Sequence, residues 1–187
     1  MRRIIYPNTI AYLKKTIRLV CVLLAVILLA RMFVFEPGVT DGRSMEMTFL
    51  DNDVFLVNKF ALLFREPNRG DIVQINMKRL NEVILKRVIG LPGEKITFKQ
   101  GDVYVITAQN QEIKLDETYL NKQHVTKDIS DHSFVSVTVP EHMYFVLGDN
   151  REMSTDSRTF GFVHRSDIFG IVRPLPAWLS KMVNHHE

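Results

Sequence analysis

The chain has little cysteine: Cys21 is the only one among its 187 residues, so one molecule can form neither a disulfide bond nor a cysteine-based metal site. Its six histidines show no His-Glu-x-x-His pattern or comparable ligand spacing, which argues against a metal enzyme. The formal net charge is only +3, and no basic stripe with interleaved aromatic residues occurs. We therefore expect no metal, no cofactor and no nucleic-acid partner.

The N-terminal region predicts a membrane anchor. Basic residues at positions 2, 3, 14, 15 and 18 precede an apolar run over 19–35 that only Arg31 interrupts. The length of this run is near the lower limit for a helix that crosses the hydrocarbon core of a bilayer. The basic residues before it favour a cytoplasmic N-terminus. We expect residues 1–18 to be cytoplasmic, 19–35 to span the lipid bilayer once, and 36–187 to form an extracytoplasmic domain. The alternative is a cleavable secretory signal peptide, but no clear small-x-small cleavage site follows the run.

The rest of the chain predicts a mainly β domain. Short β-branched and aromatic runs alternate with turn residues, which is typical of short strands. Residues 99–133 are dominated by Asn, Gln, Asp and Lys, and we interpret them as an inserted polar sub-domain between two halves of the core. Strands are predicted over 54–57, 71–75, 83–85, 103–106, 134–139 and 144–147.

Two separate segments carry candidate chemistry. Ser44 lies in the loop after the predicted anchor, where a serine alone is most often a turn residue or a helix cap. Lys86 follows the apolar run 83–85. Strand alternation places the side chains of Lys86 and Arg87 on opposite faces of the strand, so we expect one of the two to point inward. A lysine among apolar side chains has a lowered pKa and can serve as the base for a serine nucleophile. The alternative is an edge-strand lysine that reaches solvent.

A third segment, from Gly148 to Arg158, combines turn formers, charges and hydroxyl groups directly after a predicted strand. Alone it would be either a solvated loop or part of a site. The presence of the segments around Ser44 and Lys86 favours the site. The apolar run 60–64 is ambiguous: it would either dip into lipid or pack in the core.

With these segments together, the chain resembles the type I signal peptidases, membrane-anchored Ser/Lys proteases that remove signal peptides from exported proteins. The resemblance covers nearly the whole chain, and the single anchor and short insertion are similar to the Gram-positive branch. It implies a signal-peptidase-like β fold related to that of LexA, preceded by one transmembrane helix. The motifs that carry it are Ser-Met-x-x-Thr at 44–48, Gly-Asp-Ile-Val at 70–73, Lys-Arg-Val-Ile-Gly-Leu-Pro-Gly-Glu at 86–94, the segment 148–158, and Gly-Phe-Val at 161–163.

The resemblance also implies roles for single residues. Ser44 would be the nucleophile, with its backbone N–H donating to the oxyanion, and Lys86 would be the general base. Ser154 would hydrogen-bond and orient the Lys86 amine, while Asp156 and Arg158 would pair to hold their loop.

Substrate recognition follows from the same resemblance. Met45, Val83 and Leu85 would line shallow apolar pockets for small residues at positions −1 and −3 of the substrate. The substrate backbone would add as a strand beside residues 83–86. The expected partners are secretory precursor proteins, and the sequence leaves the oligomeric state open.

The chain departs from the family pattern in the loop of the nucleophile. Met47 stands where family members usually have proline, which implies a less constrained loop. Gly42 stands where some relatives have a residue with a second hydroxyl group. Many Gram-positive members also lack this hydroxyl. Met47 keeps open an alternative function, a signal-peptidase-like assembly factor for surface proteins such as pilins with weak or no protease activity. A self-cleaving regulator of the LexA type is disfavoured by the anchor and by the lack of a helix-turn-helix pattern.

Overall fold

The computed structural model describes residues 7–77, 81–107, 109–120 and 136–175. The chain divides into two compact units, Met1–Glu36 and Pro37–Glu187. The helical elements are α1 (Pro7–Val34), η1 (Phe60–Leu63), α2 (Ser157–Phe160) and η2 (Arg165–Asp167). The strands are β1 (Phe35–Val39), β2 (Val54–Asn58), β3 (Ile72–Met77), β4 (Glu82–Gly90), β5 (Lys95–Lys99), β6 (Asp102–Ile106), β7 (Glu112–Lys114), β8 (Ser136–Thr138), β9 (Met143–Leu147), β10 (Val163–His164) and β11 (Ile168–Pro174).

Helix α1 contains most of the predicted anchor, and the last residue of that prediction, Phe35, begins β1 instead. Apolar side chains between Ile10 and Leu28 are exposed along the helix. Within the described residues, however, no helix has the length and apolar character that a membrane crossing requires. The predicted transmembrane segment over 19–35 is therefore not confirmed.

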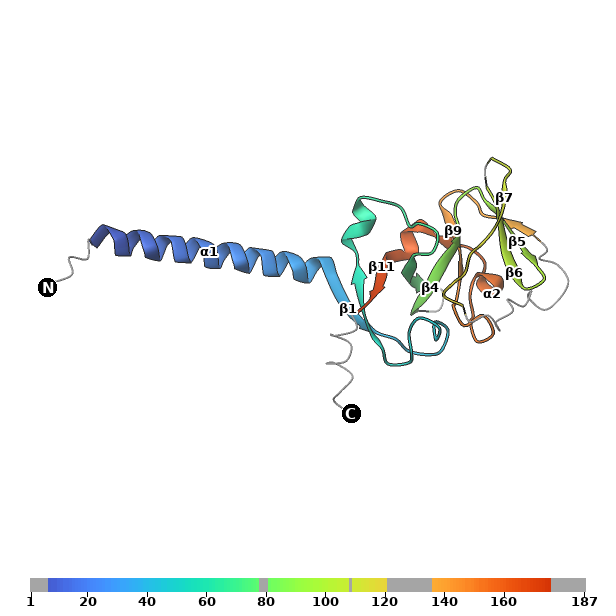
Figure 1. Ribbon diagram of the computed structural model, residues 1–187, viewed down its shortest axis with the longest axis horizontal. Coiled ribbons are helices and arrows are strands. Elements are labelled where there is room, and N and C mark those ends of the chain that lie inside the picture. The colour runs from blue at the N-terminus through green and yellow to red at the C-terminus, as the bar shows by residue number, and fades with distance from the viewer. Residues whose placement is uncertain (1–6, 78–80, 108, 121–135, 176–187) are drawn as a thin grey trace. The chain divides into compact units, whose positions relative to one another are not determined.

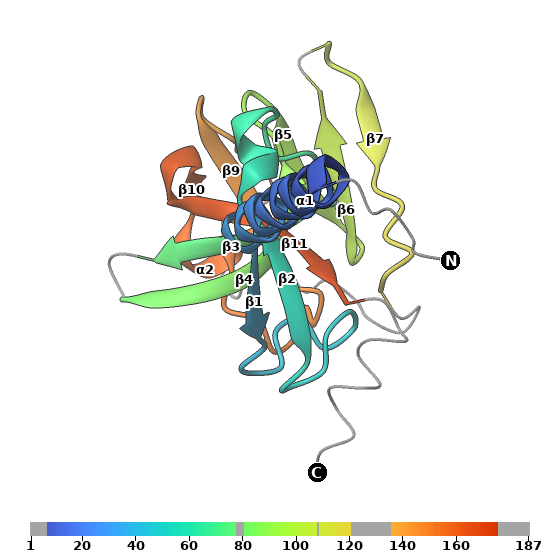
Figure 2. The ribbon, with the colours of Figure 1, turned by 90° about the vertical axis from the view of Figure 1, so that its left-hand side faces the viewer.

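Two sheets make up the second unit. Within the described residues, the larger sheet has the strand order β1-β2-β11-β3-β4-β9-β10, and the smaller one has the order β7-β6-β5-β8. Figure 1 shows β4 and β9 of the large sheet next to the strands of the small sheet, and Figure 2 shows β2, β3, β4 and β11 of the large sheet close together. The pairings of β3 with β4 and of β4 with β9 are antiparallel, so β4 is a central strand.

Buried apolar side chains cover both faces of the central strands, which explains why their sequences are apolar runs rather than strict alternations. Tyr144 and Val146 of β9 point into a cluster on one face, and Phe145 and Leu147 point into a cluster on the other. The second of these clusters joins the two sheets, because it also contains side chains from β5 and β6. A third cluster packs the loop after Ser44 onto β2, β3 and β11, and its buried members are Met45, Phe49, Phe55, Val57, Ile72 and Val172.

The predicted strands are all present within the described residues, as β2, β3, β4, β6, β8 and β9. The first two residues of the predicted strand 134–139 lie outside the described residues. The prediction of a polar sub-domain over 99–133 needs a correction. Those of its residues that the structure describes include β6 and β7 of the small sheet. Val103 and Val105 alternate with polar residues and are fully buried in the cluster between the sheets, so this stretch belongs to the core. Residues 121–133 of that prediction lie outside the described part.

Candidate active site

The predicted nucleophile and base meet in the structure. Lys86, on β4, donates from Nζ to the Oγ of Ser44 over 2.9 Å, and to the carbonyl oxygen of Leu85 over 3.0 Å. Only 3% of Lys86 is exposed. This burial lowers the pKa of Lys86 from 10.5 to about 8, although the carboxylates of Asp156 and Asp149 act in the opposite direction. A lysine with this pKa is partly neutral near neutral pH and can then accept a proton.

Arg87, the next residue on β4, is also buried, so the expectation that one of the two basic residues points inward was too narrow. Its Nε donates to Asp149 Oδ1 over 2.8 Å and its Nη2 to Asp149 Oδ2 over 2.5 Å, while Nη1 donates to the carbonyl oxygen of Gly70. Asp149 is fully buried. Both faces of β4 can accept a cation because each cation has a partner there, Ser44 on one side and a bidentate carboxylate on the other.

The loop of Ser44, the predicted nucleophile, is tied to the loop after β9. The backbone N–H of Asn150 donates to the carbonyl oxygen of Ser44 over 2.9 Å. The hydroxyl of Thr48 donates to Asp149 Oδ2 over 2.5 Å, and it accepts from Arg87 Nη2 over 2.9 Å. These contacts hold both ends of the segment that contains Met47, without the rigidity that proline would supply.

Gly148 brings this second loop against the nucleophile. A Cβ at Gly148 would lie 2.1 Å from Ser154 Oγ and 2.6 Å from the carbonyl oxygen of Ser44, so only glycine fits there. Ser154 Oγ is buried, and among the described residues it has no hydrogen-bond partner. The expected hydrogen bond from Ser154 to the Lys86 amine is therefore not observed, although the hydroxyl lies next to the backbone that carries the dyad.

Asp156 and Arg158 form the expected ion pair. Asp156 is fully buried, and its Oδ1 accepts from Arg158 Nε over 2.8 Å while its Oδ2 accepts from Arg158 Nη2 over 2.9 Å. The same Oδ2 accepts from the backbone N–H of Gly148 over 3.0 Å. The pair thus fixes the glycine that contacts Ser44.

The three predicted substrate-binding residues, Met45, Val83 and Leu85, line one pocket of about 270 Å³ together with Ser44 and Lys86. Val83 is 61% exposed at its rim, whereas Met45 is buried in its floor. The other lining residues are Gly38, Val39, Thr40, Asp41, Gly42, Phe55, Gln74 and Ile84. The pocket therefore brings apolar and polar side chains together around Ser44 and Lys86.

Gly42 also belongs to this pocket wall, and its backbone explains why no hydroxyl residue stands there. Its φ of +91° lies in the region that favours glycine, so a serine at this position would be strained. Its backbone N–H donates to Asp51 Oδ1 over 2.9 Å, which fixes this conformation.

Comparisons with known proteins identify relatives of this chain. The sequence profile of the family described as signal peptidase, peptidase S26, matches residues 13–178. The chain belongs to the signal peptidase family. Signal peptidase I S of Bacillus subtilis is 40% identical over 149 residues, which cover 76% of this chain and 77% of that protein. Signal peptidase IB of Staphylococcus aureus is 31% identical over 160 residues, which cover 82% and 83%. A crystal structure of a signal peptidase I from Enterococcus faecalis is 36% identical, with a TM-score of 0.46, and the match covers 57% of this chain and 97% of that one.

This membership establishes the general function. The chain is an enzyme of the serine protease class that removes N-terminal signal peptides, and its partners are secretory precursor proteins. The signal peptidase I family is associated with the membrane and has an extracytoplasmic catalytic domain.

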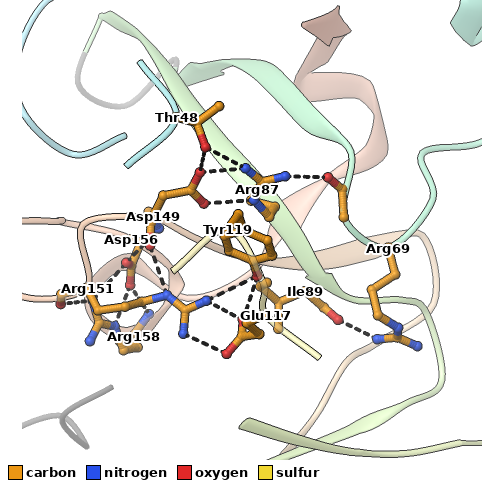
Figure 3. Close-up of polar contacts among 12 residues, drawn as sticks. Thr48, Arg69, Arg87, Ile89, Glu117, Tyr119, Asp149, Arg151, Asp156 and Arg158 are labelled. Carbon is orange, nitrogen blue, oxygen red and sulfur yellow. Dashed lines mark hydrogen bonds and ion pairs between the residues drawn. The ribbon is translucent and has the colours of Figure 1, made fainter. Parts of the chain in front are cut away.

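The structure adds residues to this signal peptidase site that sequence reasoning missed. The ring of Tyr119 lies 3.9 Å from the guanidinium carbon of Arg87, and its hydroxyl donates to Glu117 over 2.6 Å. Burial raises the pKa of Tyr119 far above its ordinary value, so the phenol stays neutral and donates. Glu117 also pairs with Arg151, whose Nε donates to the carbonyl oxygen of Gly148 over 3.0 Å. Figure 3 shows how these contacts connect to the Arg87–Asp149 pair.

No local pattern marks Glu117 and Tyr119, because both stand in a polar stretch and find their partners only through the fold. We call residues 117–119 the strap, since this segment contacts β4 through Arg87 and the loop after β9 through Arg151.

The apolar run 60–64 is partly packed in the core and partly exposed. It contains η1, and Leu62 packs against one of the core clusters. Phe60, Leu63 and Phe64 are exposed, the last two by 74% each. The lipid contact that we expect of this signal peptidase segment stays a prediction.

Proposed function

We propose that the enzyme cleaves signal peptides with a Ser44/Lys86 dyad, through an acyl-enzyme on Ser44. The observation that carries this proposal is the 2.9 Å contact between Lys86 Nζ and Ser44 Oγ, made by an amine whose burial lowers its pKa to about 8. A neutral amine at that distance can take the proton of the hydroxyl directly. The pair favours the protease over the assembly factor, because a binding protein has no need of a buried lysine with a lowered pKa held against a serine hydroxyl.

The chemistry runs in two halves. In acylation, Ser44 Oγ attacks the scissile carbonyl carbon as its proton moves to Lys86 Nζ, and the backbone N–H of Ser44 donates to the oxyanion. Such a donor is typically worth about 3 kcal/mol. Collapse breaks the C–N bond, and the Lys86 ammonium protonates the departing amine of the mature protein. In deacylation, Lys86 takes a proton from water, the hydroxide attacks the ester, and Ser44 regains its proton.

Three residues support the dyad in this proposal. Ser154 Oγ retains its hydrogen-bonding capacity next to Gly148, and we expect it to orient the Lys86 amine once substrate excludes water. Asp156 and Arg158 hold Gly148, and through it the backbone of Ser44, in place.

The substrate binds as an extended strand beside residues 83–86 of β4, with the side chains at −1 and −3 on the face that looks into the pocket. Met45, Val83 and Leu85 contact these side chains, and a pocket of about 270 Å³ shared by two positions favours residues as small as alanine.

We also propose that the N-terminal unit attaches the enzyme to the bilayer in a single pass, with residues 1–18 cytoplasmic and the β domain extracytoplasmic. The basic residues before Leu19 and the exposed apolar side chains of α1 support this topology. Membranes washed with alkaline carbonate should retain the protein, and protease added outside intact spheroplasts should digest the β domain. Release by carbonate would contradict the anchor.

A reconstituted cleavage assay tests the proposed specificity. The detergent-solubilised enzyme is given a precursor with alanine at −3 and −1, and the product is identified by mass spectrometry. We expect one cut after −1, which is lost when phenylalanine replaces either alanine. Precursors that bind without being cut would instead favour the assembly factor.

A further inference from the structure

Gln74 is one of the polar side chains in the wall of the pocket that contains Ser44 and Lys86. It lies on β3, a strand inside the large sheet, and it lines the same pocket as Ser44 and Lys86. It is half-buried, whereas its neighbours Val73 and Ile75 are fully buried on the opposite face of the strand. The glutamine side chain therefore points to the face of the sheet that carries Ile72 and Leu85, where it lines the pocket.

The strand register places Gln74 beside a predicted substrate contact. Gln74 on β3 is directly opposite Leu85 on β4, so the two side chains share a face and are neighbours. Leu85 is one of the residues that we expect to contact the substrate, and it lines the pocket as well. A side chain that packs against Leu85 therefore also reaches the amide of Gln74.

That amide has unused hydrogen-bonding capacity. Among the described residues, no hydrogen bond is made by the side chain of Gln74. A primary amide offers two donors and one acceptor, so it can both give and receive a hydrogen bond with a hydroxyl group. In the free enzyme water can satisfy it, but a bound substrate that covers the pocket removes this water.

From these observations we infer that Gln74 selects substrates with a small hydroxyl side chain, serine or threonine, at position −3. This inference rests on the proposed function, because it assigns a preference to the same site. A serine at −3 exchanges a hydrogen bond with the covered amide, whereas an alanine leaves the amide buried and unpaired.

The pairing of β3 with β4 also indicates which substrate position Gln74 contacts. Lys86 is opposite Val73, so Gln74 is one residue farther from the dyad along the paired strands. The residue at −1 carries the scissile carbonyl and must lie at Ser44. In an extended substrate, the residue at −3 points to the same face about 7 Å away, which is the distance of two residues along a strand. Because Gln74 lies farther from the dyad than Val73 does, we assign it to −3 rather than to −1.

The test compares precursors that differ only in alanine or serine at −3 and, separately, at −1. For the full-length enzyme in detergent, we expect serine at −3 to raise kcat/KM by about three- to tenfold over alanine, the effect of one hydrogen bond. The same change at −1 should bring no gain. In Gln74→Val the preference at −3 should vanish or reverse, while the alanine precursor is still cut.

Asn76→Val is the matched control, because Asn76 lies on the same face of β3, opposite Val83, but does not line the pocket. It should keep the wild-type preference. A wild-type ratio near one, a preference retained in Gln74→Val, or an equal preference at −1 would overturn the inference. The wild-type ratio decides the matter even if Gln74→Val does not fold. If the wild type cuts the alanine precursor without any preference, only the role of Gln74 fails; if it cuts no precursor, the proposed function fails with it.

Discussion

Replacing Lys86 by methionine should abolish cleavage and yet stabilise the protein near neutral pH. The side chain is 3% exposed, and burial lowers its pKa from 10.5 to about 8. That difference means that protonation is less favourable by about 3 kcal/mol in the folded state than in the unfolded state. Methionine has a similar shape and no charge, so it avoids this cost.

The size and the pH dependence of the effect follow from linkage. Below about pH 8 both states are protonated and the folded state bears the full cost; the cost falls as pH rises, and it is absent above about pH 10.5. Methionine also loses the hydrogen bonds to Ser44 and to the carbonyl oxygen of Leu85, at about 1 kcal/mol each. The net gain of Lys86→Met is therefore about 1 kcal/mol near pH 7, and it becomes a loss of about 2 kcal/mol at high pH.

Urea unfolding of the detergent-solubilised chain, followed by circular dichroism from about pH 7 to about pH 10.5, measures this difference. Lys95→Met is the matched control, since Lys95 is exposed at the start of β5 and its replacement should give no pH-dependent difference. If Lys86→Met is less stable than the wild type by the same amount at every pH, the argument that burial lowers the pKa of Lys86 is wrong.

Three other perturbations follow from the site. The wild-type kcat/KM should rise with pH to a plateau with an apparent pKa of about 8, because only neutral Lys86 accepts a proton; a flat profile below that pH, measured by precursor cleavage, would contradict this. Gly148→Ala should lower kcat about a hundredfold, because its Cβ would lie 2.1 Å from Ser154 Oγ and displace the dyad; activity near wild type in a cleavage assay would refute the close packing. Tyr119→Leu should lower the free energy of unfolding, measured with urea, by about 1 kcal/mol more than Tyr119→Phe does, because only phenylalanine keeps a ring over Arg87; equal stability of the two variants would count against the strap.

The sequence predicted the elements whose pattern is local. The central strands β4 and β9 are apolar runs and are visible without the fold, whereas the pairing of Asp156 with Arg158 was expected from the resemblance to the type I signal peptidases. Strand β11 was not predicted, although it lies inside the large sheet, because Gly170 and Pro174 interrupt it and are typical of turns. Burial by neighbouring strands overrides that local preference.

The contacts that complete the site could not be predicted, because they join distant segments. Arg87 and Asp149 are 62 residues apart, and no local sequence pattern predicts that they form an ion pair. Alternation placed Lys86 and Arg87 on opposite faces, but it could not tell that both faces are covered. Tyr119 stands in a polar stretch, and only the folded chain brings its ring onto Arg87.

The most direct test of the Ser44/Lys86 dyad is the rate of precursor cleavage by Ser44→Ala and Lys86→Ala, beside the wild type and the surface control Lys95→Ala. We expect each dyad variant to lose at least about a thousandfold in kcat/KM while its circular dichroism spectrum matches that of the wild type, and the control to cleave normally. Cleavage at near wild-type rates by either folded dyad variant would contradict the account.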